Sequence, residues 1–93
     1  MFAVLVEVDN SGEDRESRFT GLREELAPAM KRTPGFVSGV FGSNESSGTG
    51  LMLVVYDTQE RAWAIAHPIE VGSHPRPGVT VTRVEVVEVA ATA

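Results

Sequence analysis

The first apolar segment of the chain, residues 2–8, is hydrophobic at almost every position. A run of this kind, rich in β-branched residues, is typical of a strand that is covered on both faces. Turn-forming residues follow at 10–14, where Ser11 and Asp14 have the spacing of a helix start with acids in the first turn. The pattern therefore predicts a strand followed by a helix.

An amphipathic helix is predicted where apolar residues recur at spacings of three and four: Phe19, Leu22, Leu26 and Met30. Pro28 lies inside this pattern. Because proline lacks a backbone N–H and strains the preceding turn, we expect a kink or a short break at 25–27. The sequence Thr-Pro-Gly at 33–35 then ends the helix.

Two further strands are predicted at 36–41 and 51–56, and the second is apolar on both faces. The glycine- and serine-rich segment 42–50 separates them, which predicts a hairpin with a flexible tip. That segment joins two strands and lacks the residues of a phosphate-binding loop.

A second helix of about three turns is predicted after Asp57, which has the spacing of a capping-box variant with Glu60. We expect it to end at Pro68. The last strand is predicted at 79–89, where the apolar alternation shifts near Thr82–Arg83 and again at Val86–Val87. Such shifts indicate a bulge or a local twist.

The order β-α-β-β-α-β predicts an α+β fold of the ferredoxin-like type: one domain over 1–93, with two helices on one face of a four-stranded antiparallel sheet. The other face of the sheet would be apolar and bare. Monomers rarely expose such an area, so we expect a second copy of the chain to cover it in a two-fold homodimer.

Charge and composition narrow the choice of partners. Thirteen acidic and eight basic residues give a net charge of −5. This charge repels phosphate backbones and anionic lipid, so neither nucleic acid nor a membrane is an expected partner. The chain has no cysteine, which excludes disulfides and thiolate catalysis. The N-terminus lacks the basic segment of a signal peptide, and we expect a cytoplasmic protein.

Several segments together carry a resemblance to a known superfamily: Pro34-Gly35-Phe36-Val37-Ser38-Gly39, the glycine-rich hairpin, Gly50 to Asp57, the helix Arg61-Ala62-Trp63-Ala64, and the valine-rich final strand. Across nearly the whole chain they resemble the dimeric α/β-barrel superfamily, and within it the antibiotic-biosynthesis-monooxygenase-like (ABM-like) proteins. The resemblance implies a dimer whose protomers often hold a small-ligand cavity between sheet and helices. It also implies a cofactor-independent monooxygenase acting on a small aromatic substrate, although the superfamily includes many other activities.

Such oxygenases hold an electron-rich substrate among Trp, Tyr and Asn side chains, so the resemblance makes Trp63 and Tyr56 candidate catalytic residues. His67 shares a helix face with Trp63 and is the third candidate. The alternative for Trp63 and Tyr56 is ordinary core or interface packing, and for His67 a place at the helix end near the negative dipole. A non-catalytic homodimer, which either binds a small apolar or aromatic ligand or has a purely structural role, is the corresponding alternative function.

Haem-degrading relatives imply a third function. They use an asparagine on the first strand with a tryptophan and a histidine ligand, which directs attention to Trp63 with His67 or His74. Asn10, however, lies beyond the predicted strand, in the turn. A solvated loop position is the simpler interpretation of His74.

Glu7 and Glu85 are candidate buried bases if they face a cavity, because desolvation raises the pKa of a carboxyl group. We favour the alternative that they pair with Arg83 at an exposed margin of the sheet. No cluster of His, Asp or Glu has metal-ligand spacing, so we expect no bound metal and name no cofactor.

Overall fold

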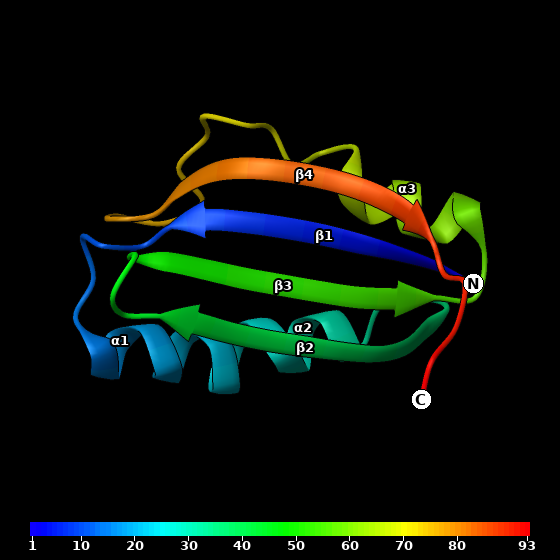
Figure 1. Ribbon diagram of the computed structural model, residues 1–93, viewed down its shortest axis with the longest axis horizontal. Helices are drawn as coiled ribbons and strands as arrows, with labels where there is room; N and C mark the ends of the chain where they lie inside the picture. The colour runs from blue at the N-terminus through cyan, green and yellow to red at the C-terminus, as the bar shows by residue number, and fades with distance from the viewer.

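A computed structural model describes residues 1–93 and has the predicted ferredoxin-like α+β arrangement. Its strands are β1 (Phe2–Asp9), β2 (Phe36–Asn44), β3 (Thr49–Tyr56) and β4 (Thr80–Glu88). They form one sheet in the order β2-β3-β1-β4, and all neighbouring strands are antiparallel. In Figure 1 the first helical segment runs alongside β2, while the second helix lies near the C-terminal end of β4.

The first helical segment is continuous but changes type along its length. It comprises α1 (Arg15–Thr20), the π-helical turn η1 (Gly21–Leu26) and α2 (Ala27–Lys31). The N–H of Ala27 donates to the carbonyl of Leu22, five residues earlier. Pro28 has no N–H to offer the carbonyl four residues before it, which favours this wider bonding pattern. The chain therefore widens around the predicted kink and does not break.

The first helix begins at Asp14, whose Oδ1 accepts from the N–H of Ser17 at 2.8 Å. This hydrogen bond is the main cause that holds the pKa of Asp14 below its ordinary value of 3.8. Ser11 does not cap the helix: its hydroxyl and N–H both donate to Asp9 Oδ1, and they lower the pKa of Asp9 in the same way. The capping residue is thus Asp14 alone.

The second helix, α3 (Gln59–Ala66), is capped by Thr58, whose hydroxyl accepts from the N–H of Arg61. Asp57 does not cap it and forms an ion pair with Arg61 at 2.9 Å. At eight residues the helix has about two turns, one fewer than predicted. It ends before Pro68, as predicted.

The hairpin and the bulge are both present. Strands β2 and β3 reach further than predicted, which leaves only 45–48 at the tip. Between β1 and β4 the register passes from the pair Glu7 and Arg83 to the pair Val8 and Val81. Thr82 is the extra residue, and its hydroxyl donates to the carbonyl of Glu7 at 3.1 Å. At Val86–Val87 the register is regular, so the predicted second irregularity is wrong.

The core lies between the sheet and the helices. Its buried members come from three strands and from α3: Val4, Val6, Met52, Val54, Tyr56, Val81, Ala62 and Ala66. Side chains alternate along a strand, so the neighbouring residues form the open face of the sheet. Paired residues of that face include Leu5, Leu53 and Val40 in one row across β1, β3 and β2. No helix of the chain is both long and apolar enough to span a membrane.

Candidate functional site

A pocket of about 580 Å³ opens between the sheet and the first helical segment. The segment from Pro68 to Val81, which leads into β4, forms its other side. Pockets of 300–1,000 Å³ with a mostly apolar lining are the usual sites of small ligands. The sequence analysis expected a cavity in this place only through the family resemblance.

The pocket floor and the helix side are apolar. The contributing hydrophobic residues come from β1, β3, the start of β4, η1, α2 and the segment after α3: Val6, Val8, Leu51, Met52, Val79, Val81, Leu22, Leu26, Ala29, Met30 and Ile69. The same spacing of Leu22, Leu26 and Met30 that predicts a helix stripe thus supplies one wall. Leu51 pairs with Glu7, so its side chain points to the other face of the sheet and only its backbone borders the pocket. The remaining side chains offer a ligand apolar contact area.

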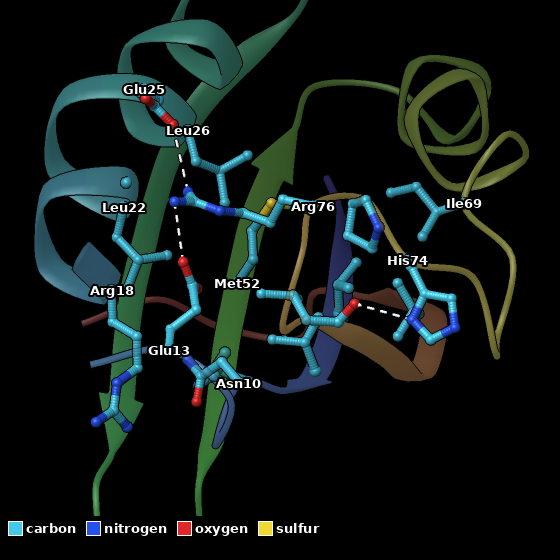
Figure 2. A pocket seen from close by; sticks show the side chains of 18 of the residues that line it. Asn10, Glu13, Arg18, Leu22, Glu25, Leu26, Met52, Ile69, His74 and Arg76 are labelled. Atoms are coloured by element: carbon cyan, nitrogen blue, oxygen red, sulfur yellow. Dashed lines mark hydrogen bonds and ion pairs between the residues drawn. The ribbon is translucent and has the colours of Figure 1, made fainter. Parts of the chain in front are cut away.

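Charged side chains meet at the edge of the pocket around Arg76. Its Nη2 lies 2.9 Å from Glu13 and its Nη1 lies 3.3 Å from Glu25. The Glu13 side chain is 10% exposed and that of Glu25 is 70% exposed, so the first ion pair is the better shielded. Figure 2 shows the guanidinium held between the two carboxylates, one from the loop after β1 and one from η1.

Gly21 makes room for this guanidinium. A Cβ at residue 21 would overlap Nη1 of Arg76. Gly21 is buried and has ordinary helical angles, with φ −61° and ψ −43°. Its requirement for glycine is therefore one of space and not of backbone conformation.

Arg18 and His74 also line the pocket, but both have partners. Arg18 lies 3.7 Å from Glu45 and its Nε donates to the carbonyl of Asp14. His74 Nδ1 lies 3.1 Å from the hydroxyl of Thr80 and 3.3 Å from the carbonyl of Val79. In Figure 2 the Arg18 guanidinium points away from the group formed by Arg76.

Asn10 borders the pocket next to the end of β1 and is the one buried polar residue, at 4% exposure. Its Nδ2 donates to Ser43 Oγ at 3.3 Å, and no protein atom donates to its Oδ1. Sequence reasoning placed Asn10 correctly beyond the strand but treated it as a turn residue. The available signal was Gly50, which pairs with Val8 and, without a side chain, leaves the space that the Asn10 amide fills.

The three candidates Tyr56, Trp63 and His67 do not line the pocket. Tyr56 is fully buried in the core, with its hydroxyl 2.7 Å from Thr33 Oγ1. Trp63 is 45% exposed and packs edge to face against the exposed His67 on the outside of α3, with 5.9 Å between ring centroids. The structure brings Trp63 and His67 together, and it keeps Tyr56 apart from them in the core.

Glu7 and Glu85 both pair with Arg83 at the margin of the open sheet face, as the favoured alternative predicts. Glu7 lies 3.5 Å from Nη1 of Arg83, and Glu85 contacts Nη2. They stand on the opposite face of the sheet from the pocket. No three His, Asp or Glu side chains gather in a way that could hold a metal ion.

Neither known protein-family models nor curated proteins show a match to this chain.

Proposed function

We propose that the protein binds a small, neutral and mostly apolar molecule in the pocket between its sheet and its first helical segment. The observation that carries the proposal is the pocket itself, about 580 Å³ in volume and lined by apolar side chains from both layers. Its size suits a molecule of two or three fused rings, or an alkyl chain of similar volume. Removing the apolar surface of such a molecule from water supplies the driving force.

The charges at the pocket edge favour a neutral ligand. The charged residues that line the pocket are two glutamates and two arginines: Glu13 and Glu25 pair with Arg76, and Arg18 pairs with Glu45 outside the pocket. A charged ligand would have to displace one of these partners and leave it without its counter-charge, which costs free energy. A neutral ligand leaves all of these ion pairs in place.

Titration with 2-methylnaphthalene, followed by calorimetry, tests this proposal. We expect saturable binding with one site per chain. Ala29 of α2 lines the pocket, so Ala29→Phe should fill it and abolish binding. Ala64→Phe is the matched control, because Ala64 is an exposed alanine of α3 outside the pocket. Equal binding by both variants, or absence of binding to the wild-type protein both of this probe and of its hydroxyl analogue 2-naphthol, would refute the proposal.

The resemblance to ABM-like proteins supports a further proposal, that the ligand is an aromatic substrate oxidised without a cofactor. Oxygen consumption with a naphthoquinol measures it, relative to the same quinol without protein. Trp63→Phe and His67→Ala then separate the two possible locations. A loss of turnover in these variants would place the chemistry on α3, while unchanged turnover would exclude these two residues, and Ala29→Phe would then test the pocket.

We also propose that two copies of the chain pair through their open sheet faces. Leu5, Leu53 and Val40 form an apolar row there, and Val40 is 62% exposed. Only 15 of the 93 residues are buried in the single chain, which is a small core for a stable domain. Glu7 and Arg83 at the margin carry opposite charges, so a two-fold axis can bring each beside its complement on the partner.

A further inference from the structure

The position of Asn10 is set by its backbone. Its N–H donates to the carbonyl of Gly48 at 2.9 Å, and its carbonyl accepts from the N–H of Glu13 at 3.0 Å. These bonds tie the residue to the hairpin tip on one side and to the loop before α1 on the other. The amide is therefore held at the end of the pocket near β3 and the hairpin (Figure 2).

The amide of Asn10 is only half satisfied within the chain. Nδ2 has a long hydrogen bond to Ser43 Oγ, while Oδ1 is covered and accepts from no protein donor. A buried carbonyl without a donor is costly, and buried polar groups in folded proteins nearly always have a partner. The chain nevertheless keeps an amide here and keeps Gly50 small beside it, since a Cβ on Gly50 would lie 2.8 Å from Nδ2.

The other polar side chains of the pocket differ from Asn10 in this respect. Arg76, Glu13 and Glu25 satisfy one another, and His74 has Thr80 and Val79. Asn10 alone is both deeply buried and short of a partner. Oδ1 is covered in this orientation, so a ligand in the pocket reaches it only when the amide turns, which exchanges the bond from Nδ2 to Ser43 for one to the ligand.

We infer that the ligand carries a hydrogen-bond donor, a hydroxyl or an N–H, on an otherwise apolar body, and that Asn10 Oδ1 accepts from it when the amide turns toward the pocket. This inference rests on the proposed function, because it assigns a ligand class to the same pocket. Asn10 is then the specificity-determining residue of the site. Sites that hydrogen-bond a ligand hydroxyl discriminate strongly against the analogue that lacks it.

The pair 2-naphthol and 2-methylnaphthalene tests the inference, because a hydroxyl and a methyl group are similar in size. In a pocket without a hydrogen-bond acceptor the methyl compound binds more tightly, since the hydroxyl loses its bonds to water. With Asn10 as acceptor we expect 2-naphthol to bind the wild-type protein about fivefold more tightly. Asn10→Ala should reverse that preference and retain binding of 2-methylnaphthalene.

Two further variants separate the role of the acceptor from that of the fold. Asn10→Asp keeps an acceptor of the same shape and should preserve the preference for 2-naphthol. Ser43→Ala removes the neighbour of Nδ2 but leaves Oδ1, so the preference should also persist. The comparison of the two probes on the wild-type protein stands even if Asn10→Ala fails to fold.

The outcomes distinguish this inference from the function on which it rests. If neither compound binds the wild-type protein, the pocket proposal fails. If both bind but 2-methylnaphthalene binds more tightly, the pocket is upheld and the inference about Asn10 is overturned. Tighter binding of 2-naphthol that depends on Asn10 supports both.

Discussion

The guanidinium of Arg76 occupies the space that a side chain at Gly21 would fill. Since Gly21 has helical angles, Gly21→Ala by itself should stabilise the helix by about 1 kcal/mol. In the wild-type protein the new methyl group also displaces Arg76 from Glu13 and Glu25, and each of these ion pairs contributes up to about 1 kcal/mol. We therefore expect little net change in the free energy of unfolding.

The same substitution in an Arg76→Gln background should give the full gain, because the shorter side chain leaves the space free. Urea unfolding of the four proteins of this double-mutant cycle measures the coupling between the two residues. An equal gain in both backgrounds would show that Arg76 does not lie over Gly21 in solution.

We expect Tyr56 to contribute to the stability of the fold and not to ligand binding. Tyr56→Phe removes the hydrogen bond to Thr33 Oγ1 and should lower the free energy of unfolding by about 1–2 kcal/mol. Thr33→Val in both backgrounds isolates the pairwise contribution. Binding of 2-methylnaphthalene should stay unchanged, because Tyr56 does not line the pocket. A Tyr56→Phe protein of normal stability that no longer binds the probe would instead support the role that the family resemblance implies.

The start of the first helix should make stability depend on pH at the acid end. The pKa of Asp14 is lowered in the folded chain, chiefly by the N–H of Ser17, and that of Asp9 by the hydroxyl of Ser11. A lowered folded pKa adds stability that is fully present above the unfolded value near 3.8 and disappears as the pH falls through the folded value.

Asp14→Asn keeps a capping oxygen but has no carboxylate that can be protonated at this position. Its thermal midpoint should therefore fall less than that of the wild-type protein between about pH 5 and pH 2. Thermal unfolding monitored by circular dichroism provides the comparison. Parallel curves for the two proteins over this range would contradict the lowered pKa of Asp14 in the folded chain.

The proposed pairing of two chains can be tested with a matched pair of variants. Val40 and Val71 are 62% and 64% exposed, but Val40 stands on the open sheet face and Val71 lies in the loop after α3. Sedimentation equilibrium at micromolar concentration should give twice the 10.0 kDa chain mass for the wild-type protein. Val40→Lys places a charge in the proposed interface and should weaken association by about tenfold or more, whereas Val71→Lys should not. A wild-type monomer, or equal effects of the two variants, would reject pairing through this face.

Local patterns in the sequence were sufficient to predict the sheet and one of its two irregularities, but not the shift between Phe36 and Ser38 in β2. The alternation of 79–89 breaks at Thr82, where the bulge lies, and Pro28 marks the part of the helix that widens. The observed strand boundaries differ from the predicted ones where polar residues continue a strand. The last residues of β2 pair with β3 despite their glycine and serine content.

The polar residues of the pocket could not be predicted from such patterns, because their roles depend on contacts between distant segments. Arg76 meets Glu25 across 51 positions, and Asn10 meets Ser43 across 33. Neither Arg76 nor Asn10 belongs to a recognisable motif, and each is a residue type that is common in loops. Trp63 and Tyr56 attracted attention as the only Trp and Tyr of the chain, yet one lies on the surface and the other in the core.

The site of ligand binding is tested most directly by intermolecular nuclear Overhauser effects between 2-methylnaphthalene and the methyl groups of the protein. The account predicts contacts to Met52 and Val81 of the sheet and to Leu22 of η1, because these residues line the pocket. Leu5 and Leu53 on the open face should show none. Contacts to Leu5 and Leu53 without contacts to Met52, Val81 or Leu22 would contradict the proposed binding site.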